Sequence, residues 1–132
     1  MANLLVSKKY FWLATIWTAL IAILCLESAH SLPSIGFKIK GLDKIVHAVF
    51  HLVFTVLWFL YFKSKGASFQ KSIFCAVVLS VFYGIIIEIC QQAFTTTRQA
   101  DILDFLANTT GALLAAIILY QFKTRIFDDK IV

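Results

Sequence analysis

The sequence predicts an all-α, polytopic membrane protein, a bundle of four transmembrane helices with both termini in the cytoplasm. Hydrophobic residues make up 61% of the 132-residue chain, and the mean hydropathy is +0.87. Charged residues make up only 14%, whereas a soluble domain usually carries about 25%. The apolar residues form four runs, each close to the roughly 17–25 residues that a helix needs to cross a bilayer. Three cysteines fall inside these runs, and we expect buried thiols rather than a disulfide framework or a zinc site: Cys25, Cys75 and Cys90.

The first predicted helix covers about residues 10–27 and follows the basic pair Lys8 and Lys9. A short basic segment before an apolar run is also typical of a signal peptide. Cleavage needs small residues after the run, but Glu27 stands there, followed by Ser28 and Ala29. We therefore expect the first helix to be retained in the membrane.

Three further helices are predicted over about residues 43–62, 72–92 and 101–122. A short basic loop follows the second helix, and a polar hairpin rich in threonine joins the third to the fourth. Helices are expected because each span must satisfy its own backbone hydrogen bonds within lipid. Residues 1–132 are therefore predicted to form a single membrane domain.

The lysine and arginine residues predict how the bundle is oriented. One end of the alternating path carries Lys8, Lys9, Lys63, Lys65, Lys71, Lys123, Arg125 and Lys130. The other end carries Lys38, Lys40, Lys44 and Arg98. The positive-inside rule assigns the richer end, and with it both termini, to the cytoplasm. Because the basic residues lie between apolar runs rather than on one basic face, we expect no nucleic-acid partner despite the net charge of +5.

Two histidines, His47 and His51, lie on one face of the second helix, one and two turns after Asp43. Imidazoles at this spacing can bind one metal ion or relay a proton. The alternative is that Asp43 caps the helix and that the histidines bond to neighbouring helices. Because the sequence reveals no clear third ligand, we expect no metal and no cofactor.

The fourth helix presents polar and small residues along one face: Asp101, Asp104, Asn108 and Gly111. Carboxylates near a helix N-terminus interact favourably with its macrodipole, which is a sufficient structural reason for Asp101. Asp104 lies deeper, so this reason fits it less well. Gly111 and Ala115 form a small-xxx-small pair that lets another helix approach closely.

Glu88 is the polar residue that is hardest to explain by structure alone. It lies near the C-terminal end of the third helix, where the helix dipole disfavours a carboxylate. It must be protonated, reach water or meet a cation. Arg98 is the natural partner because the hairpin folds back over the helix end, and Lys44 is the alternative. A structural pair that closes the hairpin and a functional pair remain equally good interpretations.

Three different motifs lie at the same end of the predicted bundle. The second helix opens with Asp43-Lys44-x-x-His47, and two longer motifs follow: Gly84-x-x-x-Glu88-x-x-Gln91 and Arg98-x-x-Asp101-x-x-Asp104-x-x-x-Asn108-x-x-Gly111. In combination they resemble the VanZ-like family of bacterial membrane proteins, over the chain from Asp43 to about Tyr120. His51 departs from the pattern, because many relatives place a tyrosine there.

The VanZ-like family takes its name from a protein associated with low-level resistance to teicoplanin, a glycopeptide antibiotic that bears a fatty-acyl chain. The resemblance implies a multi-pass protein of the bacterial cytoplasmic (inner) membrane, connected with envelope lipids or with such antibiotics. It supplies no mechanism.

The first functional hypothesis is a binding protein whose extracytoplasmic site holds a polar headgroup while the helices accommodate an acyl chain. The expected partners are membrane lipids and a lipid-linked envelope precursor or lipoglycopeptide. The alternatives are an intramembrane enzyme that acts on a lipid or cell-wall precursor, and a small proton-coupled transporter. A homo-oligomer is compatible with each. The expected site residues are Asp43, Lys44, His47, Glu88, Gln91, Arg98, Asp101, Asp104 and Asn108.

Overall fold

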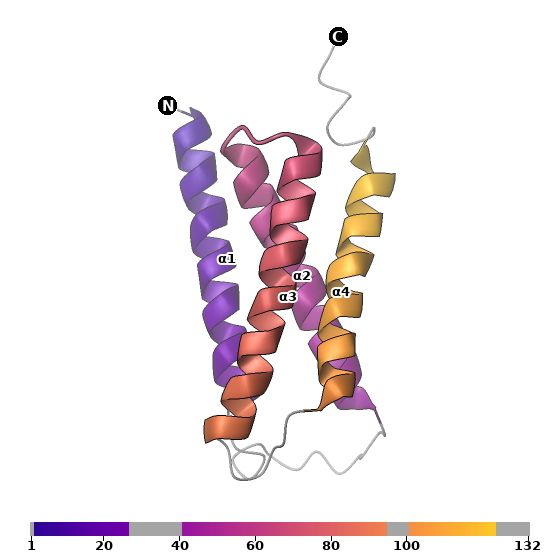
Figure 1. Ribbon diagram of the computed structural model, residues 1–132. Coiled ribbons are helices and arrows are strands. Elements are labelled where there is room, and N and C mark those ends of the chain that lie inside the picture. Colours follow the sequence, from indigo (N-terminus) through magenta and orange to yellow (C-terminus); the bar gives the residue numbers. More distant parts are fainter. Residues whose placement is uncertain (1, 27–40, 95–100, 124–132) are drawn as a thin grey trace.

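The computed structural model confirms the predicted fold class. It describes residues 2–26, 41–94 and 101–123. These residues form four helices and no strand: α1 (Ala2–Leu26), α2 (Leu42–Ser64), α3 (Phe69–Phe94) and α4 (Ile102–Gln121). The four helices run along one another as a bundle (Figure 1).

Each of the four helices is long and apolar enough to cross a membrane. Their outward-facing positions carry large exposed hydrophobic side chains, among them Trp12, Phe74 and Leu113. Such a surface would be a liability in water but suits contact with lipid tails. The chain is therefore a multi-pass membrane protein, as its composition predicts. The helix α1 begins at Ala2, before the apolar run itself, so that Lys8 and Lys9 belong to the helix.

The helix α2 is the centre of the bundle, since it contacts α1, α3 and α4 and packs most extensively against α4. Close packing between α2 and α4 depends on Gly111, where a Cβ atom would overlap the backbone of Ala48. Ala115, one turn further along α4, is fully buried. The small-xxx-small prediction for Gly111 and Ala115 is thus confirmed, and α2 is the helix that approaches.

Hydrogen bonds from aromatic side chains hold α1 against the rest of the bundle. Trp17 Nε1 donates to the carbonyl oxygen of Phe50 at 3.0 Å, and the Tyr83 hydroxyl donates to the carbonyl oxygen of Thr18 at 2.6 Å. These donors are partly buried among apolar side chains, where an unsatisfied N–H or O–H would be costly.

Of the cysteines, Cys25 is buried as expected, whereas Cys75 and Cys90 are partly exposed.

The two ends of the bundle differ in charge. The start of α1, the α2–α3 turn and the end of α4 lie at one end (Figure 1), and the lysines of these segments lie with them: Lys8, Lys9, Lys63, Lys65, Lys71 and Lys123. Lys44 lies at the opposite end, in the first turn of α2. There Gly41, with φ of 85°, is the N-cap of α2, so the interpretation of Asp43 as the cap is wrong.

Candidate functional site

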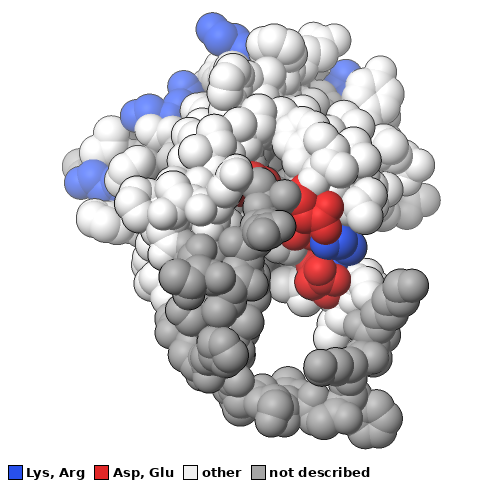
Figure 2. All heavy atoms as spheres, turned by 60° about the horizontal axis from the view of Figure 1, so that its bottom comes forward, with Lys and Arg blue, Asp and Glu red and all other residues white. Residues whose placement is uncertain are grey.

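The acidic side chains of the described residues gather at the end of the bundle opposite the lysine-rich one. They come from the start of α2, the last turns of α3 and the start of α4: Asp43, Glu88, Asp101 and Asp104. Figure 2 looks towards this end and shows the red acidic side chains around one blue basic side chain. The polar motifs, far apart in the sequence, therefore meet in one place, which we call the polar site.

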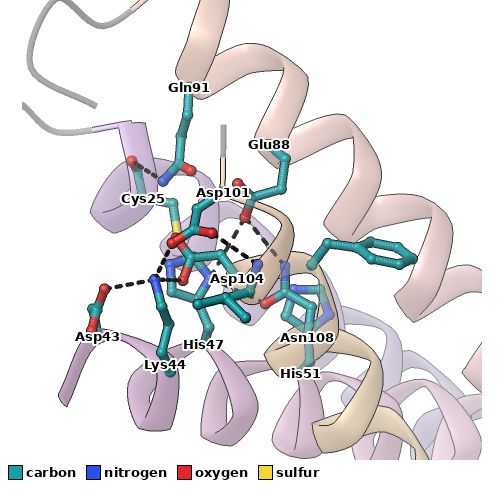
Figure 3. Close-up of polar contacts among 12 residues, drawn as sticks. Cys25, Asp43, Lys44, His47, His51, Glu88, Gln91, Asp101, Asp104 and Asn108 are labelled. Atoms are coloured by element: carbon teal, nitrogen blue, oxygen red, sulfur yellow. Dashed lines mark hydrogen bonds and ion pairs between the residues drawn. The ribbon is translucent and has the colours of Figure 1, made fainter. Parts of the chain in front are cut away.

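Lys44 is the centre of the outer part of the polar site (Figure 3). Its Nζ lies 3.0 Å from Asp43 Oδ2, 2.6 Å from Asp101 Oδ2 and 2.6 Å from Asp104 Oδ1. The exposed side-chain fraction falls from 58% for Asp43 to 38% for Asp101 and 13% for Asp104. One ammonium group therefore faces three carboxylates, and the innermost carboxylate is the one most shielded from water.

The inner part of the polar site is a buried hydrogen-bonded set from three helices. Asn108 Oδ1 lies 3.1 Å from His47 Nδ1, and Asn108 Nδ2 lies 3.5 Å from Glu88 Oε1 (Figure 3). Glu88 Oε1 is also 4.0 Å from His47 Nδ1. All three side chains are almost completely buried. Within the described part of the chain, Glu88 Oε2 has no hydrogen-bond partner.

The structure decides against one of the two partners that the sequence suggested for Glu88. Among the described residues, Lys44 forms its ion pairs with the three aspartates and none with Glu88. Arg98, the other predicted partner, lies outside the described residues. Glu88 instead faces His47 and Asn108, which spacing along the chain could not show.

The structure also separates two residues from the centre of the polar site. His51 Nδ1 lies 2.9 Å from the Ser80 hydroxyl, and the His51 ring packs beside those of Phe54 and Tyr83, which stack on each other. His51 therefore belongs to the contact between α2 and α3 and does not share a ligand set with His47. Gln91 Nε2 donates to the Cys25 carbonyl oxygen at 2.8 Å and so secures the last turn of α1.

Gly84 contributes to the polar site without a side chain, a role that the sequence alone did not predict. A Cβ at this position would lie 3.1 Å from Asn108 Nδ2 and 3.2 Å from His51 Cε1. Because Gly84 has no Cβ, the polar side chains of α4 and α2 can lie directly against α3. The only sequence signal for this role is that Gly84 stands one turn before Glu88 within the motif.

An apolar cavity adjoins the polar site between α1 and α2. Its volume is about 290 Å³, at the lower end of the range of ligand pockets. Most of its lining is apolar, and Asp43 and His47 form its polar edge: Leu24, Cys25, Leu42, Asp43, Val46, His47 and Phe50. A molecule in this cavity would touch lipid-like side chains and the polar site at once.

The model of the family described as VanZ/LLP1 matches residues 3–124. The chain belongs to the VanZ/LLP1 family. The match covers all four helices and every residue of the polar site, and it confirms the resemblance inferred from the motifs. No curated protein and no solved structure matches the chain.

In this VanZ/LLP1 chain, Asp101 has the structural role that its position predicted. It is the N-cap of α4, and its Oδ1 accepts a hydrogen bond from the Leu103 amide at 2.9 Å. The hydrogen bond from Lys44, together with that from the Leu103 amide, holds the pKa of Asp101 below its ordinary value of 3.8. Since the folded state favours the ionised carboxylate, the stability that it contributes is present above pH 3.8 and is lost as the pH falls further.

Replacement of Asp101 by alanine is expected to lower the thermal unfolding midpoint in detergent by about 2–4 °C, because the cap and a Lys44 partner are both lost. Asp101→Asn keeps a cap acceptor and should lose less. The wild-type protein loses the stability contributed by the ionised Asp101 as the pH falls, whereas the asparagine variant has no carboxylate to protonate there. The thermal midpoint of the variant should therefore fall less between pH 5 and 3 than that of the wild type. Equal midpoints for the alanine variant and the wild type would contradict the capping role.

Proposed function

We propose that this VanZ/LLP1 protein binds an envelope lipid or an acylated glycopeptide antibiotic, with the polar headgroup at the polar site and an acyl chain in the cavity. The observation that carries the proposal is the cavity itself, because an apolar pocket between two helices ends at His47. A ligand with one polar and one apolar part matches that arrangement.

The distribution of lysines supports a site on the extracytoplasmic side. By the positive-inside rule, the lysine-rich end with both termini faces the cytoplasm, and the polar site then faces the outer leaflet of a bacterial cytoplasmic membrane. Envelope precursors and glycopeptide antibiotics are encountered on that side. In this proposal the protein acts in glycopeptide (teicoplanin) resistance by holding the acylated molecule or its lipid target.

The groups in the polar site indicate how a headgroup would be held. Lys44 already has three carboxylate partners, so its ammonium group would attract an anionic headgroup only weakly. The buried oxygens of Glu88 and Asp104 accept hydrogen bonds, which suits the hydroxyl and amine groups of a sugar-bearing headgroup. Arg98 stays the predicted contact for an anionic group.

Filling the cavity is the direct test of this proposal. Val46 lines the cavity, and Val46→Trp is expected to weaken the binding of an acylated ligand at least about tenfold because the indole takes the place of the chain. Binding would be measured in nanodiscs with fluorescent undecaprenyl-type lipid and with labelled teicoplanin. A glycopeptide without an acyl chain serves as the ligand control.

Val49→Trp is the matched control variant. Val49 lies on the same helix, is exposed, and does not line the cavity. It should bind as the wild type does. If Val46→Trp folds and binds the acylated ligands with wild-type affinity, the cavity is not the acyl site and the proposal fails.

An intramembrane enzyme is the second candidate, and one observation favours it. His47, Asn108 and Glu88 form a buried set beside the cavity, and a histidine near a carboxylate is suited to acid–base chemistry on a bound precursor. Under this hypothesis, purified protein converts a lipid-linked precursor and Glu88→Gln abolishes conversion but not binding. Absence of product with wild-type protein would remove this candidate. The proton-coupled transporter stays a prediction from sequence.

A further inference from the structure

We propose that His47, Glu88 and Asp104 form a binding site for a divalent first-row transition-metal ion, of which Mn²⁺ and Zn²⁺ are the best matches. The inference builds on the proposed function, because such an ion would face a headgroup held at the polar site. It departs from the sequence-based expectation of no metal, which rested on the lack of a third ligand for His47.

The geometry provides the missing ligands. One nitrogen of His47 and one carboxylate oxygen each of Glu88 and Asp104 lie within 4.8 Å of one another. Bonds of about 2.0–2.2 Å to a metal place its ligand atoms at most about 4.4 Å apart. Side-chain shifts of a few tenths of an ångström to about 1 Å would therefore close the three groups around one ion. The ligands come from α2, α3 and α4, so the ion would join three helices.

An orphaned oxygen atom points independently to a ligand. Glu88 retains only 8% of its side-chain exposure, and its Oε2 has no hydrogen-bond partner among the described residues. Buried carboxylate oxygens are normally satisfied by a donor or a metal, because their desolvation is costly. A cation between Glu88 and Asp104 supplies the missing interaction.

The charges of the polar site favour a cation over an anion. Its described residues include four carboxylates and one ammonium group, and Lys44 is engaged with the three aspartates. Asp104 has both kinds of partner within reach, since its Oδ1 is paired with Lys44 and one of its carboxylate oxygens belongs to the three-ligand set. A divalent ion would offset most of the excess negative charge and offer open coordination positions to a phosphate or hydroxyl oxygen.

Asn108 has the position of a supporting residue around such an ion. His47 Nδ1 lies 3.1 Å from Asn108 Oδ1 and 4.0 Å from Glu88 Oε1, so Asn108 contacts the same edge of the imidazole that faces Glu88. The amide group of Asn108 also donates to Glu88 Oε1. Asn108 thus orients the Glu88 ligand through this hydrogen bond, as outer-shell partners in metal sites do, and lies against the third ligand, His47. One imidazole with two carboxylates suits Mn²⁺ or Zn²⁺ better than Mg²⁺, which prefers oxygen ligands.

The test measures metal binding directly, without any lipid ligand. Full-length protein in detergent is stripped with a chelator and titrated with Mn²⁺ or Zn²⁺, with metal content measured by mass spectrometry and affinity by calorimetry. We expect one equivalent to bind. Glu88→Gln and Asp104→Asn should weaken the affinity at least about 100-fold, and Asn108→Ala about 10–100-fold.

Thr110→Ala is the matched control, because it changes an exposed side chain of α4 outside the polar site and the ligand set. Its affinity should stay within about threefold of the wild type. If a ligand variant does not fold, the electron-paramagnetic-resonance signal of Mn²⁺ bound to wild-type protein decides, because a ¹⁴N coupling reports an imidazole ligand. No bound equivalent in the wild type, no such coupling, or equal affinities for wild type and Glu88→Gln would overturn the inference.

The outcomes also separate this inference from the proposed function. Metal binding in the absence of any lipid binding supports the metal site and refutes the lipid-binding proposal. Lipid binding that persists in chelator-treated protein, together with no bound metal, refutes the metal site and supports the lipid-binding proposal.

Discussion

Gly111→Ala is expected to destabilise the bundle by about 3 kcal/mol, the upper end of what overpacking usually costs. The added Cβ would overlap the carbonyl group of Ala48, which is backbone and cannot rotate away. The helices α2 and α4, which form the most extensive helix contact of the bundle, would have to move apart. The ion pair between Lys44 on α2 and Asp104 on α4 would be stretched as a result. Thermal or denaturant unfolding of purified protein in detergent measures the loss.

Gly84→Ala provides a graded comparison for Gly111→Ala. The Cβ at Gly84 would lie 3.1–3.2 Å from the side chains of Asn108 and His51, which can yield by a few tenths of an ångström. We expect a loss of about 1 kcal/mol there. Thr110→Ala, at an exposed position next to Gly111, should be close to neutral. A Gly111→Ala protein as stable as the Thr110→Ala protein would show that α2 and α4 do not pack as described.

Lys44→Met is expected to destabilise the protein by about 1–3 kcal/mol, because three carboxylates lose their common cation. Asp104 is the most affected of them, since its side chain is only 13% exposed and cannot regain full hydration. The effect is smaller than for a fully buried pair because the Lys44 side chain is 28% exposed and its charge is partly screened. Unfolding midpoints at low ionic strength measure the change.

A double-mutant cycle identifies the carboxylate that carries this effect. Lys44→Met combined with Asp104→Asn should recover at least half of the lost stability, because the buried uncompensated charge is gone. Lys44→Met with Asp43→Asn should recover little, since Asp43 is 58% exposed. If both double variants behave alike, the ion pair between Lys44 and Asp104 has no special role in holding α2 to α4.

The sequence alone determined the fold class and which face of the second and fourth helices would be polar. Hydropathy predicts four spans because lipid leaves the backbone no partners outside the helix. The period of the helix places Asp104, Asn108 and Gly111 on one face of α4, and the structure buries all three. The same reasoning assigned Asp101 to the helix end and Gly111 to a close helix contact, and both predictions are confirmed.

Only the tertiary structure decided which faces meet. Glu88 faces His47 and Asn108 rather than Lys44, because the rotation of α3 against α2 and α4 is set by packing at small residues such as Gly84. Spacing along a chain gives the direction of a side chain on its own helix but carries no information about the neighbouring helix. For this reason the sequence could predict only that the motifs of Asp43, Glu88 and Asp101 lie at the same end of the bundle. The close approach of His47, Glu88 and Asp104 became visible only in the three-dimensional structure.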